Sequence, residues 1–570
     1  MRDKLFYNGI FHSMCSEEDT FYGMLIKNGR IAMRFANQEQ IDKYIRYESS
    51  RSEIERLNKK LFDVRGQKEK HIEIGSSRSK CGNWKMPEMI DLKGEHVYPC
   101  LIDGHVHLLL TVAVMAMGFN ACEITGSGVE PHTLAGVEAR VREYASHQPA
   151  DATIAINNYV LSAIDERRMP NRHELDDWGG GRAIVIYNID GHSTALSTAM
   201  LEKVGIDPST SDGVLQGEAN ERAQGRIIDT VGSAIGAATL AKGVANFHNY
   251  CGEYGINIVG ALEGNGDSKK DTTTKLIIAL ARHFGIGVRL YLQYTDLSRV
   301  QPYRKLMKHP RLGGCGDWEM DGASGSHSAA FRTPYIDTNE THDCYYTQDF
   351  VNDICRKADA KGYQIASHAI GECAIERILE GLNGTTSGRM HRIEHCEFHD
   401  DAGFDELAKG RYAIMMQPGY SWIDKRYLHT YEQVLPQEIR DRMKFKSLYD
   451  AGIVVCGSSD SPVQDMDPYL QMLGMVQFYN EQESLTAYQA LTTYTVNAAK
   501  AIQEYDDYGT LEVGKIADFF TSEQDFCKIS PEQVVDFRPT KTYYGGIPFK
   551  KWKGSIAELV KMMLTLPKKI

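Results

Sequence analysis

Two histidines separated by one residue end an apolar run near position 100. The stretch Tyr98–Leu110 reads Tyr-Pro-Cys-Leu-Ile-Asp-Gly-His-Val-His-Leu-Leu-Leu. If this run is a β-strand, His105 and His107 point to one face and Val106 to the other, because side chains alternate along a strand. Both imidazoles can then reach one metal ion. An isolated His-x-His is more often a pair of structural histidines on a half-buried strand, so the rest of the chain has to decide.

Three later apolar runs also end in residues that can bind a metal. Ile365-Ala-Ser is followed by His368, the run Met390-His-Arg-Ile-Glu by His395, and Val454-Val-Cys-Gly-Ser-Ser by Asp460. A single histidine at a strand end is usually a hydrogen-bonded structural residue. Together with the first pair, however, these residues supply four imidazoles and a carboxylate, a donor set suited to zinc or a similar divalent ion. The sequence therefore predicts a metal site.

The elements that would carry these residues alternate between short apolar runs and longer helical segments over about 97–504. This alternation is typical of βα units around a parallel sheet. We expect an α/β fold, a (β/α)8 TIM barrel, in which the C-terminal strand ends meet at one mouth. A doubly wound sheet is the alternative, but its Gly-rich dinucleotide turn is absent. The candidate strands include Ala183–Tyr187, Ile256–Gly260, Val288–Leu292, Tyr363–Ser367, Ala413–Met416 and Ile453–Cys456.

The two chain ends are predicted to form a separate β-rich domain. Residues 1–96 contain β-type runs beside two Asn-Gly pairs, Asn8–Gly9 and Asn28–Gly29, and Asn-Gly is a hairpin signal. A charged, helical insertion is expected at about 38–70. Residues 505–570 return to β character and then predict a terminal helix. Because each end has too few strands to bury a sheet face alone, we expect the two ends to pair.

Composition excludes several classes of partner. The 570 residues carry a net charge of −12, which argues against nucleic acid and anionic membranes, since both favour basic surfaces. The N-terminus has no apolar core of a signal peptide, and no apolar run approaches the ~20 residues of a membrane span. Twelve cysteines without a C-x-x-C pair indicate reduced thiols in a cytoplasmic protein. We expect a small-molecule substrate and leave a homodimer open.

The order of the motifs resembles the amidohydrolase superfamily, in the amidohydrolase family 3 branch that includes N-substituted formamide deformylase. The resemblance covers nearly the whole chain. It implies a barrel joined to a small β-sandwich built from both termini. It also implies that His105 and His107 lie on the first barrel strand, His368 on the fifth, His395 on the sixth and Asp460 on the eighth. The matching motifs are Pro99-Cys-Leu-Ile-Asp-Gly-His-Val-His, Asp190-Gly-His-Ser, Asp321-Gly-Ala-Ser, Ser367-His-Ala-Ile-Gly-Glu, His391-Arg-Ile-Glu-His, Gly457-Ser-Ser-Asp-Ser-Pro and Gly509-Thr-Leu-Glu-Val-Gly-Lys-Ile-Ala-Asp.

One departure from the family bears on the number of ions. The family often has a lysine, carbamylated when it bridges two metals, four residues before the Asp321–Gly322 pair. Here that position is Asp317, and no lysine is near. Cys315, Asp317 and Glu319 share one face if the segment is a regular strand, so any of them or none could replace the lysine. The missing lysine favours one ion over two, with Asp317 as the bridging candidate if a second is bound.

With these residues in place, the resemblance implies a hydrolase acting on a carbon–nitrogen bond other than a peptide bond, with an amide, N-formyl or cyclic amide as substrate. Asp460 is the expected general base for a metal-activated water, and zinc is the expected ion. His192 is predicted either to contact substrate or to orient its own loop, and Glu394 to fix the ring of His395. The alternatives are a non-hydrolytic reaction on the same barrel (isomerisation, elimination or decarboxylation) and a non-catalytic metal-binding protein.

Overall fold

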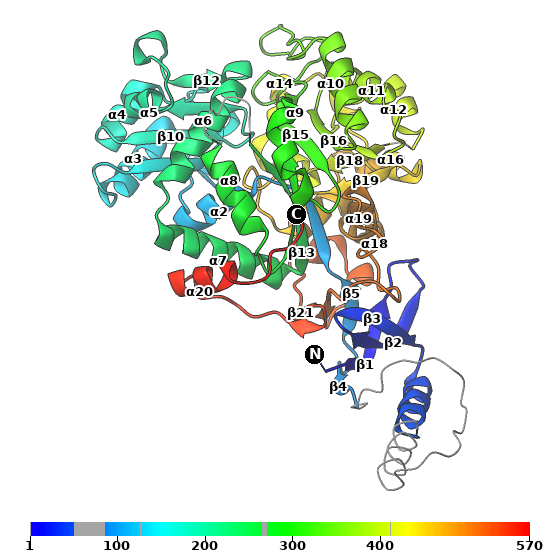
Figure 1. Cartoon of the computed structure of the whole chain (residues 1–570). Helices are drawn as coiled ribbons and strands as arrows, with labels where there is room; N and C mark the ends of the chain where they lie inside the picture. The colour runs from blue at the N-terminus through cyan, green and yellow to red at the C-terminus, as the bar shows by residue number, and fades with distance from the viewer. Residues whose placement is uncertain (1, 51–85, 126–127, 265–270, 411) are drawn as a thin grey trace. The chain divides into compact units, whose positions relative to one another are not determined.

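The computed structural model (Figure 1) describes residues 2–50, 86–125, 128–264, 271–410 and 412–570. These residues form two compact units. The first contains Met1–Cys100, Asp506–Asp525 and Pro539–Phe549, and the second contains Leu101–Tyr505, Phe526–Arg538 and Lys550–Ile570. Both units are therefore built from segments that are distant in the sequence.

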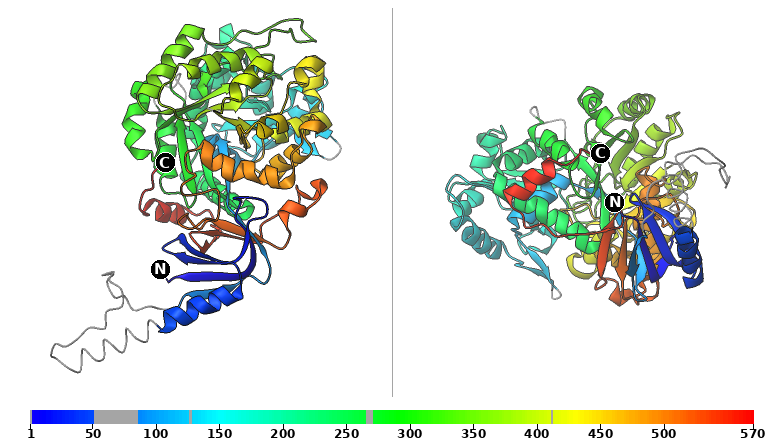
Figure 2. Two further views of the ribbon diagram at one scale, coloured as in Figure 1. Left: turned by 90° about the vertical axis from the view of Figure 1, so that its right-hand side faces the viewer. Right: turned by 60° about the horizontal axis from the view of Figure 1, so that its bottom comes forward.

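The first unit is one sheet to which both chain ends contribute strands. In Figure 2 the orange-red C-terminal strands lie beside the blue N-terminal ones. The strand order is β22-β21-β20-β5-β1-β2-β3, with β4 paired to β1. The two-sheet sandwich implied by the resemblance stays a prediction. The strands are β1 (Lys4–His12), β2 (Thr20–Lys27), β3 (Arg30–Phe35), β4 (Glu88–Asp91), β5 (His96–Pro99), β20 (Phe519–Ser522), β21 (Lys541–Tyr544) and β22 (Ile547–Pro548).

The two Asn-Gly pairs have different roles in this sheet. Asn28 (φ 52°) and Gly29 (φ 76°) form the tight turn between β2 and β3, as predicted, because this turn needs positive φ at both central residues. The hairpin predicted at Asn8–Gly9 is wrong. Asn8 also has a positive φ, 55°, but it lies inside β1 at a shift in the pairing with β2. The pair makes a bulge there, since β1 advances four residues from Tyr7 to Phe11 while β2 advances two from Gly23 to Phe21, and the chain does not reverse.

A helix over residues 38–50 covers part of this sheet. Ile41, Tyr44 and Ile45 recur at helical spacing and pack against a buried cluster that includes Leu5 and Phe35. This is the first part of the helical insertion predicted at about 38–70. Residues 51–70 of that prediction lie outside the described residues.

The contribution of the C-terminal strands can be tested at Phe519. This side chain is fully buried, with its ring centroid 5.0 Å from that of Phe6 and 4.8 Å from that of Tyr543. Phe519→Ala is expected to destabilise the first unit by about 3–5 kcal/mol, the usual cost of deleting a buried aromatic ring. Denaturant unfolding would measure it, with Ile547→Ala, at a 43% exposed position on β22, as the control. Equal stability of the two variants would contradict a shared core.

The second unit contains a nearly closed barrel of eight parallel strands. Its strands follow one another in sequence order from β6 to β19, and a parallel bridge joins Val106 of the first strand to Ser461, four residues after the last. Helices such as α7 (Ala237–Tyr254), α10 (Gln348–Ala360) and α11 (Glu372–Asn383) surround it (Figure 1). The α/β barrel prediction is confirmed. The barrel strands are β6 (Leu101–Val106), β13 (Ile256–Glu263), β14 (Gly287–Leu292), β15 (Arg311–Glu319), β16 (Gln364–Ala369), β17 (His391–His395), β18 (Tyr412–Met416) and β19 (Val454–Gly457).

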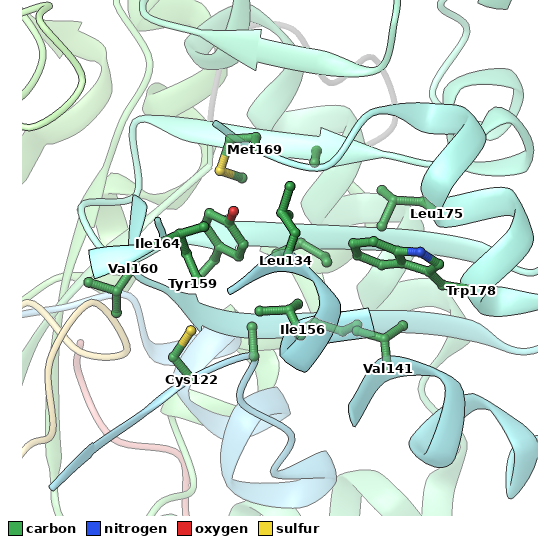
Figure 3. Packing of buried hydrophobic residues seen from close by; sticks show 14 of the residues in the cluster. Cys122, Leu134, Val141, Ile156, Tyr159, Val160, Ile164, Met169, Leu175 and Trp178 are labelled. Atoms are coloured by element: carbon green, nitrogen blue, oxygen red, sulfur yellow. The ribbon is translucent and has the colours of Figure 1, made fainter. Parts of the chain in front are cut away.

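An additional four-stranded sheet is inserted between the first and second barrel strands. It has the order β12-β11-β10-β9, made by β9 (Thr153–Tyr159), β10 (Ala183–Asn188), β11 (Ser193–Leu196) and β12 (Val214–Gln216). Figure 3 shows its apolar packing, in which Trp178 and Leu175 of α4 (Arg172–Gly179) lie near Ile156. The run at 183–187 is thus a strand as predicted, but it belongs to this sheet and not to the barrel. The turn after β10 carries His192.

Among the described residues, no single helix has the length and apolar composition needed to cross a membrane. The helices α6 (Glu218–Ala234) and α7 meet those criteria only when taken together, as a pair bent by 108°.

Candidate metal centre

The junction of the first and last barrel strands brings three predicted ligands together. His105 lies on β6, His107 follows it, and Asp460 lies three residues after β19. The Asp460 Oδ1 atom is 3.0 Å from His105 Nε2 and 3.2 Å from His107 Nε2. The backbone holds this geometry, because the Asp460 amide donates to the His105 carbonyl (2.9 Å) and the His107 amide to the Ser461 carbonyl (2.8 Å). The carboxylate is thereby fixed between the two imidazoles.

The other two predicted histidines complete a ring of four imidazoles. His368 lies on β16 and His395 ends β17, with their ring centroids 4.4 Å apart. The His395 centroid is 5.2 Å from that of His105, which connects this pair to the first one. His395 (φ 65°) and Asp460 (φ 57°) both adopt the left-handed conformation, which is uncommon for residues other than glycine and tends to cluster at functional sites.

Glu394 fixes the ring of His105, not that of His395. Its Oε2 atom is 2.7 Å from His105 Nδ1, and its other contacts are hydrogen bonds donated by Arg392 at 2.8 and 2.9 Å. The prediction that Glu394 holds His395 is therefore wrong. The two oxygens of Glu394 contact His105 and Arg392 instead. With Nδ1 occupied, His105 presents Nε2 to the centre.

Gln417 fixes the ring of His395. Its amide nitrogen donates to the Met415 carbonyl (3.2 Å) and to Ser458 Oγ (3.0 Å), so its oxygen faces His395 Nδ1 at 2.8 Å. The acceptor oxygen requires the proton on Nδ1 and leaves the lone pair on Nε2. That Nε2 atom is buried and has no hydrogen-bond partner among the described residues. It is the orphaned polar atom expected of a metal ligand.

Loss of the Gln417 contact should weaken metal binding. Gln417→Leu removes the acceptor that orients His395, and loss of such a contact typically lowers metal affinity by about 10–100-fold. Competition with a chelating dye would measure the dissociation constant. Gln293→Leu is the control, because Gln293 is also a buried glutamine but makes no hydrogen bond to an imidazole among the described residues. Equal affinities for the two variants would contradict the role assigned to Gln417.

The fourth barrel strand places Cys315, not Asp317, beside the imidazoles. The Cys315 Sγ atom is 3.6 Å from His105 Nε2 and 4.0 Å from His368 Nδ1. Asp317 instead accepts a hydrogen bond from the Thr295 amide at 3.3 Å, and it belongs to none of the potential metal-binding groups among the described residues. The preference for Asp317 came from counting back from Asp321, and the shared face with Cys315 and Glu319 assumed a regular strand. In the structure the pairing of β15 with β16 jumps from Gly314 to Glu319, which breaks the alternation of side chains.

His192 lies beside this ring with a carboxylate behind it. Its ring centroid is 5.1 Å from that of His368, and its Nδ1 atom is 3.0 Å from Glu221 Oε1. Burial lowers the pKa of His192, but the Glu221 carboxylate more than offsets this effect and raises the pKa to about 9. The protonated imidazole therefore presents Nε2–H as a donor. Glu221 gave no signal in the sequence analysis, because it lies on α6 and meets His192 only through the fold.

Two hollows give access to the ring. One, of about 970 Å³, is lined by His107, His192, Cys315, Glu319 and other residues. The second, of about 480 Å³, is lined by His395, Glu397, Gln417, Tyr420 and Tyr431 among others. Both include Asp460. A small molecule in either hollow would lie against the cluster of four imidazoles, as expected for a binding site at the C-terminal end of a barrel.

The donor set fits a divalent metal. Potential ligand atoms lie within 4.8 Å of one another in four overlapping groups: His105 with His107 and Asp460, His105 with Cys315 and His395, Cys315 with Glu319 and His368, and His192 with Glu221 and Glu319. Imidazole, carboxylate and thiolate are the ligands that zinc uses in proteins, and the imidazole tautomers are fixed by outer partners as in known zinc sites.

An eight-stranded parallel barrel with this donor set at its C-terminal end belongs to a recognised class of protein. Residues 88–548 match the model of the amidohydrolase family, and the chain is a member of that family. It is 25% identical over 498 residues to the putative amidohydrolase YtcJ of Bacillus subtilis (strain 168), covering 80% of this chain and 90% of that one. It is 23% identical over 506 residues to N-substituted formamide deformylase of Arthrobacter pascens, covering 81% and 89%.

Solved structures share the fold at low sequence identity. An uncharacterized metal-dependent hydrolase from Pyrococcus horikoshii OT3 superposes with a TM-score of 0.67 at 18% identity, covering 93% of this chain and 99% of that one. A second, from Pyrococcus furiosus, gives a TM-score of 0.64 at 19% identity, covering 92% and 100%. These similarities support the barrel architecture described above.

Proposed function

We propose that this chain is a metal-dependent hydrolase that cleaves the C–N bond of an amide, an N-formyl amine or a cyclic amide. The observation that carries the proposal is the Asp460 carboxylate held between His105 and His107 at the edge of both hollows. Membership of the amidohydrolase family supports a hydrolase. The relative named as an N-substituted formamide deformylase makes N-formyl amines the first substrates to test.

Zinc is the ion we propose for this centre. His105, His107, His368, His395 and Asp460 would hold it, with Cys315 as a further donor. A divalent ion bound there would polarise the substrate carbonyl and lower the pKa of a water molecule from ~15.7 toward ~7. The side chains have to supply the remaining steps: binding and orienting the substrate, accepting a proton and returning it.

In this proposal Asp460 moves the proton. Its carboxylate is ionised, since burial raises its pKa but the neighbouring imidazoles, His105 first, more than offset this and keep it well below the ordinary value. An ionised carboxylate can accept the proton of the attacking water and deliver it to the leaving nitrogen, which would otherwise depart as an unstable amide anion. The leaving group is then a neutral amine.

His192 would stabilise the oxygen of the attacked carbonyl. Its Nδ1 side is directed at Glu221, so the opposite edge of the ring, Nε2–H, remains for the substrate. A fixed, positively charged donor next to the carbonyl stabilises negative charge as it develops in the transition state. His192 also lines both hollows, which is consistent with a contact to substrate.

The test is a product assay on metal-loaded and metal-stripped protein. N-formyl amines, N-acetyl amines and lactams would be incubated with each form, and released amine and carboxylate would be quantified. Release of both products by the zinc-loaded form alone is expected. Conversion without release of an amine would favour an isomerase, eliminase or decarboxylase. No conversion by a fully metal-loaded protein would favour a non-catalytic role.

A further inference from the structure

More donors converge on the centre than one zinc ion uses. Zinc in proteins is almost always four-coordinate, and in catalytic sites the protein fills only three of the four positions. The described centre brings four imidazoles, one carboxylate and one thiol together in overlapping groups, from His105, His107, His368, His395, Asp460 and Cys315. Six protein donors exceed the needs of one ion, but they suit two ions that share a ligand.

Cys315 is the side chain that lies between the two halves of this donor set. Its Sγ atom approaches His105 on one side and His368 on the other, at 3.6 and 4.0 Å. Glu319 reaches only one half, since its two ligand groups, with Cys315 and His368 and with His192 and Glu221, contain none of His105, His107 or Asp460. Among the described residues of β15, Cys315 is therefore the only donor placed to touch both ions.

The backbone of β15 is built to bring this thiol inward. Gly313 (φ 93°), Gly314 (φ 109°) and Gly316 (φ 61°) have the positive φ that glycine tolerates and other residues rarely adopt. A Cβ on Gly313 would lie 2.0 Å from the Ala366 carbonyl oxygen of the neighbouring strand, so glycine is required there for close approach. These glycines produce the irregular segment that directs the Cys315 side chain toward the four imidazoles.

We propose that the Cys315 thiolate is the shared ligand of a two-ion centre, with His105, His107 and Asp460 on one ion and His368 and His395 on the other. The inference rests on the metal-dependent function proposed above and deepens it. The thiol loses its proton as the ions bind, and the sulfur donates one lone pair to each. The two ions then need no carbamylated lysine as their shared ligand, and so no carbon dioxide to form one. A second ion also revises the preference for a single ion that the missing lysine suggested.

A bound metal ion would itself favour the ionised thiol, since it competes with the proton for the sulfur lone pair. The thiolate is the form of cysteine that binds metal. Asp460 is the anionic donor in the other ligand group that contains His105, which it forms with His105 and His107.

The experiment is metal loading of the full-length protein with cobalt, followed by absorption spectroscopy and metal analysis. The stripped protein would be reloaded in carbon dioxide-free buffer. We expect two ions per chain and a thiolate-to-cobalt charge-transfer band in the near ultraviolet. X-ray absorption of the zinc form should show a Zn–S shell near ~2.3 Å. Cys315→Ser should lose the band and at least one ion.

Asp317→Asn is the matched control, because Asp317 lies on the same strand at the position that sequence counting favours. It should keep both ions and the band. The inference is overturned if Cys315→Ser keeps them, or if Asp317→Asn loses the second ion. Should the Ser variant fail to fold, as judged by circular dichroism, the wild-type spectra decide, and absence of a sulfur ligand there overturns it. None of these measurements uses a substrate, so failure of the proposed hydrolysis would be seen separately.

Discussion

Asp460→Asn is expected to lower the turnover number by about 10²–10⁴-fold while the protein keeps its fold and most of its metal. This is the usual cost of losing a positioned acid or base. Asn has nearly the shape of Asp, and its oxygen can still accept a hydrogen bond or donate a lone pair. It cannot store a proton. The variant should therefore hold the centre together but fail to transfer the proton from water to the leaving nitrogen.

Steady-state kinetics with metal content measured on the same samples would test this expectation. Asp465→Asn is a suitable control, since Asp465 is exposed and lies on the same loop five residues further along. Near-normal turnover by the Asp460 variant would mean that the base lies elsewhere. A helix-capping role offers no alternative, because the next helix, α17 (Pro468–Val476), is capped by Asp467.

The double substitution His105→Ala with His107→Ala is expected to lose the ion held beside Asp460 and to abolish hydrolysis. It removes two of the three donors in the group that includes Asp460, and Asp460 with the shared Cys315 leaves fewer protein ligands than a zinc site uses. Metal per chain should fall by at least one ion, and activity to that of the stripped wild-type protein. Elemental analysis after gel filtration would measure the first effect and the product assay the second.

The matched control for this double variant is His248→Ala. His248 is also a buried histidine of the second unit, but it stacks on Trp552 with ring centroids 3.9 Å apart and lies outside the potential metal-binding groups of the described residues. The His248→Ala variant should keep its full metal content. Full metal occupancy in the double variant would contradict the assignment of His105 and His107. Circular dichroism is needed alongside, since the change leaves Glu394 with Arg392 as its remaining partner.

Sequence alone could locate most of the centre because those residues obey a local rule. His105, His368, His395 and Asp460 each follow an apolar run, and in a parallel barrel the ends of such runs meet. The structure brings all four together with His107. The periodicity of strands and the order of the elements were enough to predict that these residues lie close together.

The errors arose where the chain departs from a regular strand or where tertiary contacts choose the partner. Counting residues from Asp321 favoured Asp317, but the glycine-rich bulge in β15 places Cys315 in the ring. The Gly313-Gly-Cys-Gly run was the available warning, since glycines inside a strand often mark a bulge. Gln417 meets His395 only because the end of β18 lies beside β17. No local pattern encodes that contact.

The membership of strands in sheets shows the same limit. The apolar run at 183–187 predicts a strand correctly, yet it pairs with β9 and β11 and not with a barrel strand. Hydrophobic periodicity reports how one segment is buried, but not which neighbour buries it. The inserted sheet matters for function, because it presents His192 beside the ring.

The central claim is that metal binds among the four clustered histidine side chains at the C-terminal end of the barrel. The most direct test is a crystal of the zinc-loaded protein with diffraction data collected on both sides of the zinc absorption edge. The account predicts two anomalous peaks about 3.5–4 Å apart, as in two-metal sites, one beside His105, His107 and Asp460 and the other beside His368 and His395. A crystal of fully zinc-loaded protein with no anomalous peak among these four histidines would contradict the claim.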